Sequence, residues 1–135
     1  MTRLTGATLL LLVTLSVLAA QDKVPIEVRY KEATLTTARG SSVQLSCEAV
    51  YDFEQCRQLH VVWVRDGKKR VELTDPRRFF TTVSETVSED GTRRRQVLTE
   101  ILEVIPEDAG QFQCQAKCED GEMAMGLFIW INVNG

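Results

Sequence analysis

The chain has 135 residues, enough for one domain, and carries 16 Lys and Arg against 19 Asp and Glu, a formal net charge of −3. Because nucleic-acid binding requires surplus positive charge, this balance argues against a DNA- or RNA-binding protein. After the first 20 residues no apolar run is long enough to span a bilayer, and the longest candidate, residues 126–131, is far too short.

The first 20 residues have the pattern of an export signal. Arg3 supplies the positive end, residues 9–18 supply the apolar stretch, and Ala19 and Ala20 are the small residues of a cleavage site. The alternative is an uncleaved membrane anchor, although the apolar stretch is short against the roughly 20 residues of a spanning helix. We therefore expect a signal peptide over residues 1–20 and one domain over residues 21–135.

The remainder of the chain alternates apolar and polar residues in short runs separated by turn signals, and no long helical period occurs. This pattern predicts an all-β domain. Strands are expected at residues 24–30 and 34–38 (one split edge strand), 43–47, 60–64, 69–73, 79–87, 97–101, 112–116 and 125–133. Asp66-Gly67 predicts a two-residue hairpin, Asp90-Gly91 another turn, and Pro106 a short helical turn.

Two distant cysteines bracket a tryptophan: Cys47 and Trp63 are followed by the run from Asp108 to Cys114, which reads D-A-G-Q-F-Q-C. In these residues the chain resembles the immunoglobulin superfamily over essentially all of residues 21–135. The resemblance implies an immunoglobulin-like β-sandwich with Greek-key connections and two antiparallel sheets. A hybrid of the V-set and I-set types is expected, because the segment from Trp63 to Arg78 is short and the last strand lacks a Gly-x-Gly bulge motif.

The resemblance also implies roles for individual residues. Cys47 and Cys114 are expected to form the disulfide between the sheets, with Trp63 packed against it. Arg78 is expected to form a salt bridge with Asp108. The remaining expected core residues are Val104, which closes the base of the sandwich, and Phe112, which replaces the usual corner tyrosine and so lacks its hydroxyl.

The other two cysteines, Cys56 and Cys118, are expected to form a second disulfide. If Trp63 lies opposite Cys114 on adjacent antiparallel strands, Cys118 faces Leu59, three residues from Cys56. This bridge either ties two ligand-facing loops together or acts as a plain structural staple. A zinc site is a third possibility, with unfavourable ligand spacing in a chain that has a single histidine.

Residue patterns for catalysis are absent from the sequence. His60 is the only histidine, no Ser or Cys lies in a nucleophile elbow, and no glycine-rich phosphate loop or metal-ligand cluster occurs. We therefore expect a protein that is not an enzyme and that needs no cofactor or metal.

The expected binding surface is the outer face of the sheet that contains the tryptophan strand. Its predicted contact residues are His60, Val62, Val64, Gln113, Gln115, Lys117, Phe128 and Trp130. Phe128 and Trp130 belong to this face only if Leu127, Ile129 and Ile131 point inward; a shift of one residue would place them in the core. The basic runs 68–70 and 93–95 leave a sulfated glycan as a further possible ligand.

Part of the sequence resembles, more narrowly, the ectodomain of the B- and T-lymphocyte attenuator type of inhibitory receptor. The resemblance rests on Cys47, on Cys56 followed by R-Q-L-H-V-V-W up to Trp63, on residues 71–75 and on the Asp108-x-Gly110 corner. It implies a secreted or cell-surface protein that recognises a protein ligand or receptor on a cell surface, either as a soluble form or as the ectodomain of a longer receptor. The alternative is a homodimer or adhesive contact through the same face.

Overall fold

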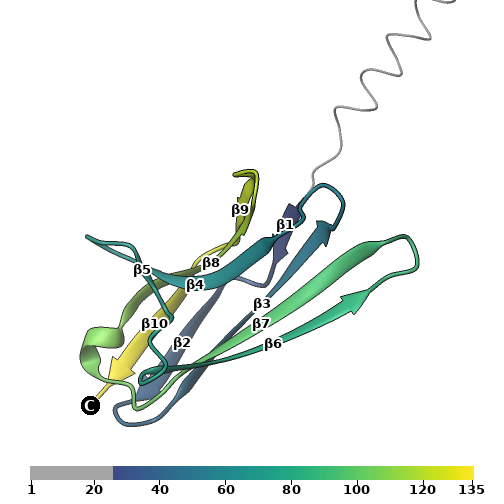
Figure 1. Ribbon diagram of the computed structural model, residues 1–135. Helices are drawn as coiled ribbons and strands as arrows, with labels where there is room; N and C mark the ends of the chain where they lie inside the picture. Colours follow the sequence, from purple (N-terminus) through teal and green to yellow (C-terminus); the bar gives the residue numbers. More distant parts are fainter. Residues whose placement is uncertain (1–25) are drawn as a thin grey trace, which may run out of the picture.

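The computed structural model describes residues 26–135, so the expected signal peptide lies outside the described residues (Figure 1). The elements are β1 (Ile26–Arg29), β2 (Ala33–Ala38), β3 (Val43–Asp52), β4 (Leu59–Asp66), β5 (Val71–Glu72), β6 (Phe79–Val87), β7 (Thr92–Ile101), the 3-10 turn η1 (Pro106–Asp108), β8 (Gly110–Cys118), β9 (Met123–Met125) and β10 (Ile129–Asn134). The expected all-β class and the helical turn at Pro106 are confirmed.

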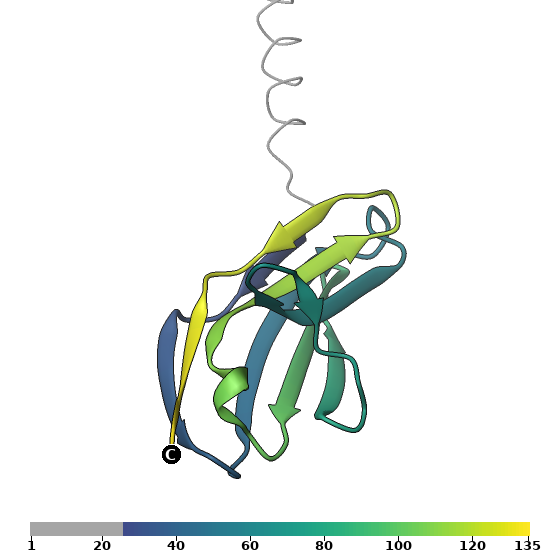
Figure 2. The ribbon, with the colours of Figure 1, turned by 90° about the vertical axis from the view of Figure 1, so that its left-hand side faces the viewer.

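The strands form two sheets that pack face to face (Figures 1 and 2). The first has the order β1-β3-β7-β6, and the second the order β2-β10-β8-β4-β5, with β9 paired to β8. The predicted split of the first strand is confirmed: β1 joins one sheet and β2 the other, where β2 runs parallel to β10. The other strand pairs are antiparallel.

Between the sheets lies a core centred on Trp63, which is completely buried, and on the disulfide Cys47–Cys114, which joins β3 to β8. Trp63 lies opposite Cys114 in the ladder, as predicted. The other buried members of this core are Leu45, Leu73, Val97, Ile101, Val104, Phe112, Ile129 and Ile131. A disulfide that closes a loop of this length stabilises the fold by about 4 kcal/mol.

A second buried cluster surrounds the disulfide Cys56–Cys118, at the end of the sandwich where β3 leads into β4. Leu59 lies opposite Cys118, and this is the register on which the prediction of the second disulfide rested. Ile26, Ala49, Tyr51 and Ala116 are buried beside the two sulfur atoms. The second bridge therefore stabilises a hydrophobic cluster of its own.

The predicted two-residue hairpin at Asp66-Gly67 is wrong. β4 ends at Asp66 and β5 begins only at Val71, so residues 67–70 form a longer connection, and Gly67 does not adopt the positive φ that a tight hairpin turn of this kind needs. β5 then contains only two residues. As a consequence, the second sheet ends early and leaves the inner face of β6 without a facing strand.

The expectation of one continuous last strand is also wrong. Met125 lies opposite Gln115 and Ile129 lies opposite Phe112, so four steps along the last strand match three steps along β8. One extra residue is accommodated in the segment from Gly126 to Phe128, which separates β9 from β10. This is the geometry of a β-bulge, and it occurs here without the Gly-x-Gly motif.

Candidate functional site

Tyr30, in the crossing between β1 and β2, organises the bulge in the last strand. Its ring packs against Trp63, with the centroids 5.0 Å apart, and its hydroxyl reaches the gap between β9 and β10. There the hydroxyl oxygen accepts a hydrogen bond from the backbone N–H of Cys114 at 3.0 Å and donates its proton to the carbonyl of Leu127. A side-chain hydroxyl thus replaces one backbone contact between β8 and the last strand.

Gly126 is the residue that makes room for this arrangement. A Cβ atom at this position would overlap the Tyr30 ring, so a close approach of ring and backbone requires glycine here. The N–H of Gly126 bonds to the carbonyl of Cys114 at 3.0 Å, and its own carbonyl accepts from the amide of Gln113 at 2.8 Å. Burial raises the pKa of Tyr30, although the hydrogen bond from Cys114 opposes that shift.

The bulge decides the direction of the side chains that follow it. Ile129 and Ile131 point into the core, and Trp130 points outward with 46% of its surface exposed. Leu127 was expected to point inward but is 55% exposed, because it lies within the bulge where the alternation is interrupted. Phe128 is half-buried.

Exposed apolar side chains follow one another along β9, the bulge and β10. Met123 and Met125, opposite Lys117 and Gln115, are 49% and 36% exposed, and Leu127 and Trp130 come after them in the chain. We call Met123, Met125, Leu127 and Trp130 the apolar strip. Neither methionine was among the predicted contact residues, although their alternation in M-A-M was a visible strand signal.

Val62 and Val64 of β4 do not contribute to this surface, and their expected exposure is wrong. They face outward by register, yet only 6% and 1% of their surfaces are accessible. Longer side chains in the same cross-strand rows close over them. Arg70, from the β4–β5 connection, reaches Met125 of β9 at 3.4 Å between nitrogen and sulfur, so this contact crosses the outer face above β4 and β8.

The polar residues predicted for this face lie around the strip. Gln113 and Gln115 are half-buried in β8, and Lys117 is exposed at the end of that strand. His60, exposed on β4, lies opposite Lys117, and its Nε2 atom is 3.8 Å from a carboxylate oxygen of Glu72. The face therefore combines an apolar strip with a polar margin, which is the composition of many interaction surfaces.

At the opposite end of the sandwich, Arg78 and Asp108 form the corner ion pair, with 2.6 Å between Nη2 and Oδ2. Asp108 also accepts the backbone N–H of Ile105 at 2.9 Å. Val104 and Phe112 are buried nearby in the core. These residues shape the fold and do not contribute to the apolar strip.

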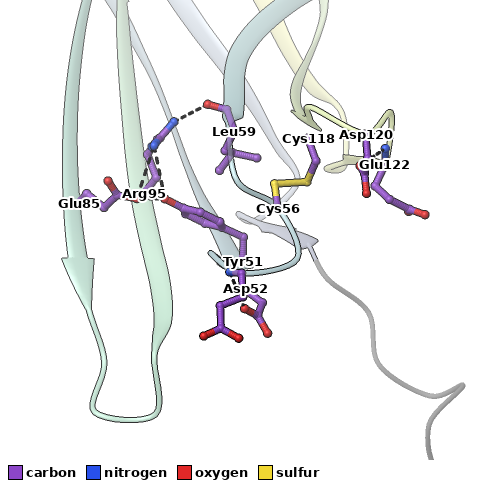
Figure 3. Close-up of a disulfide and its surroundings, with 10 residues drawn as sticks. Tyr51, Asp52, Cys56, Leu59, Glu85, Arg95, Cys118, Asp120 and Glu122 are labelled. Carbon is purple, nitrogen blue, oxygen red and sulfur yellow. Dashed lines mark hydrogen bonds and ion pairs between the residues drawn. A yellow bond between two sulfur atoms is a disulfide. The ribbon is translucent and has the colours of Figure 1, made fainter.

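The second disulfide adjoins a polar network between the sheets (Figure 3). Arg95 of β7 donates a hydrogen bond to the carbonyl of Leu59 at 2.6 Å and lies near both Tyr51 and Glu85. The hydroxyl of Tyr51 donates to Glu85. Burial, and then this carboxylate, raise the pKa of Tyr51.

Arg95 belongs to the basic run considered above for glycan binding, and all three arginines of that run have partners within the chain. Arg93 lies over the ring of Phe53 at 3.8 Å from its centroid, and Arg94 pairs with Glu48 at 3.4 Å. These contacts join β7 to β3, to β6 and to the β3–β4 connection, so the run 93–95 has a structural role.

Within residues 26–135, no group of three His, Cys, Asp or Glu side chains is arranged to hold a metal ion. In the same part of the chain, no helix has the length and apolar character needed to cross a bilayer. The candidate site is the surface formed by the apolar strip and its polar margin on the second sheet.

Comparison with known proteins supports the fold. The family model of the immunoglobulin domain matches residues 33–124, which include all four cysteines, Trp63 and the Asp108 corner. A search of curated proteins found no match.

Proposed function

Because the chain belongs to the immunoglobulin domain family, we propose that it is an extracellular recognition module that binds a protein partner through the apolar strip. Domains of this family commonly bind other macromolecules through their surfaces. The single observation that carries the proposal is the exposure of Trp130 together with Met123, Met125 and Leu127 along β9, the bulge and β10.

The composition of the strip favours a macromolecular partner. Tryptophan is among the residues that contribute most to binding energy, and methionine adapts its shape to a partner surface. Half-buried glutamines and Lys117 lie beside it and can supply the polar rim of an interface.

An extracellular location is part of the same proposal. All four cysteines are bonded in two disulfides, which form and persist in oxidising compartments. The signal-like pattern of residues 1–20 would direct the chain there. Resemblance to the B- and T-lymphocyte attenuator type further favours immune or cell-surface recognition, with an inhibitory receptor ectodomain or its soluble form as the finer proposal.

The test is binding of a fluorescent tetramer of the purified protein to a panel of leukocytes. We expect Trp130→Ala to abolish the staining that the unchanged protein gives, with a melting temperature close to that of the parent. Val71→Ala is the matched control, because Val71 is equally exposed but lies on β5, outside the strip. Equal staining by the Trp130 variant and the parent would rule out the strip as the binding surface.

A further inference from the structure

β6 is an unusual edge strand. Within residues 26–135 it lies at the edge of the first sheet, pairs only with β7 and has nine residues, whereas the other edge strands β1, β2, β5 and β9 have four, six, two and three. Its register with β7 runs without interruption from Phe79 opposite Ile101 to Val87 opposite Arg93, so no bulge bends it away from a neighbouring chain.

The backbone of β6 presents unpaired groups at this edge. Leu102 donates to the carbonyl of Arg78 at 2.9 Å, and Ser88 donates to that of Thr92 at 2.8 Å. The even-numbered residues of β6 therefore exchange hydrogen bonds with β7, since the bonds of an antiparallel ladder alternate along each strand. Thr81, Val83, Glu85 and Val87 direct their N–H and C=O groups toward the open edge.

Side chains that natural edge strands use for protection are missing from β6. The strand contains no Lys, Pro or Gly, and its one charged residue, Glu85, is engaged by Arg95 at 3.5 Å. Val83 and Val87 face the inner side of the sheet but are 56% and 63% exposed, because the two-residue β5 does not extend the opposite sheet over them. Figure 1 shows β6 at the open edge of its sheet, beside β7.

We propose that two copies of this chain pair antiparallel along β6, which joins their four-stranded sheets into one sheet of eight strands. The strand matches itself when the two-fold axis passes through Val83. Val83 then lies opposite Val83 of the second copy, Phe79 lies opposite Val87, and Glu85 lies opposite the uncharged Thr81. Apolar residues thus face apolar residues, and no two like charges face each other, which favours a second copy over an unrelated strand.

This contact is separate from the apolar strip, which lies on the other sheet and stays free for a partner. One strand from each copy buries little surface, so the dimer is expected to be weak and reversible. Sedimentation from about 10 μM to about 1 mM should show its mass rising toward that of two chains. A protein that stays monomeric throughout that range overturns the proposal.

Amide hydrogen exchange gives a second readout that only strand pairing produces. Where nine-tenths of the chains are paired, the amides of Thr81, Val83, Glu85 and Val87 should exchange roughly tenfold more slowly than in dilute protein. The amides of Thr82, Ser84 and Thr86 already bond to β7 and should change little. Equal slowing of both sets, or of neither set, contradicts pairing through this edge.

A substitution completes the test. Val83→Lys should weaken the dimer at least tenfold while the folded domain keeps its melting temperature, because the side chain is exposed and the lysine places two like charges together at the axis. Thr36→Lys is the matched control, on the exposed edge strand β2 of the other sheet, and should leave the dimer intact. Loss of the dimer on Trp130→Ala, with Val83→Lys unaffected, assigns self-association to the apolar strip and overturns the proposal.

Discussion

The last strand and β6 both expose apolar side chains, but for different physical reasons. In the last strand, the exposure of Leu127 follows from a bulge that Tyr30 and Gly126 create within the sheet. In β6, the exposure of Val83 and Val87 follows from the short β5, which leaves nothing to cover a regular strand. One surface depends on a few specific contacts, and the other on the overall layout of the strands.

This difference indicates how each surface responds to mutation. Changes at Tyr30 or Gly126 should disturb the apolar strip and the stability of the domain together, because the same contacts support both. Changes on β6 should alter self-association and leave stability almost unchanged. Four measurements distinguish the two responses.

The largest effect is expected for Gly126→Ala. The new Cβ meets the Tyr30 ring, which is held by Trp63 and by two hydrogen bonds, so the bulge must distort. We expect a loss of about 3 kcal/mol in the free energy of unfolding, measured by urea denaturation. Gly67→Ala is the control and should be nearly neutral, because Gly67 has no positive φ and only ordinary contacts. Equal losses for both variants would contradict the role of the ring.

Tyr30→Phe should have the next largest effect. The variant keeps the ring but leaves the N–H of Cys114 and the carbonyl of Leu127 without their common partner. A loss of about 2 kcal/mol is expected from these unpaired backbone groups. The tryptophan fluorescence of Trp130 should also change as the bulge relaxes. A variant as stable as the parent would show that the hydroxyl does not support the bulge.

Alkaline pH should act through the same hydroxyl. The folded protein holds the proton of Tyr30 to higher pH than the unfolded chain does, because burial raises the pKa of Tyr30 above its ordinary value of 10.0. The contribution of protonated Tyr30 to the free energy of unfolding is therefore complete below about pH 10 and is lost as pH rises through the pKa of Tyr30 in the folded protein. Thermal unfolding from about pH 8 to about pH 11 should show a smaller decline for Tyr30→Phe than for the parent. Parallel declines would argue against this linkage; Tyr51 contributes the same trend in both proteins.

The smallest effect on stability is expected for Val87→Thr on β6. Threonine keeps the β-branched shape and the exposed site needs no apolar partner, so the free energy of unfolding should change by less than about 0.5 kcal/mol. Urea denaturation of the dilute, monomeric protein measures this change in the free energy of unfolding. A loss comparable to that of Tyr30→Phe would mean that β6 is packed in solution, and the contrast between the two strands would disappear.

Much of the fold could be predicted from local patterns. The spacing of Cys47, Trp63 and Cys114 and the Asp108 corner predicted the sandwich and its core through the resemblance to the immunoglobulin superfamily that these residues carry. The same resemblance located the Arg78–Asp108 pair. The second disulfide could be located because the ladder register places Cys118 opposite Leu59, close to Cys56.

The candidate binding surface was harder to predict from sequence patterns. Val62 and Val64 alternate outward, yet Arg70 of the β4–β5 connection and Met125 of β9 meet above this face. Burial of an outward-facing residue depends on side chains that are distant in sequence, and no strand pattern contains that information. The direction of Leu127 depended in the same way on Tyr30, nearly a hundred residues earlier in the chain.

The amino-acid sequence was enough to predict strands from their period of two and, through the resemblance to the immunoglobulin superfamily, the sandwich, the inter-sheet disulfide and the core around Trp63. Which apolar side chains reach the surface became visible in the folded molecule alone. The exposure of Leu127 depends on the Tyr30 hydroxyl, which is inserted into the second sheet, and the exposure of Val83 and Val87 depends on β5, which is too short to cover them. Both outcomes depend on segments that meet only after folding.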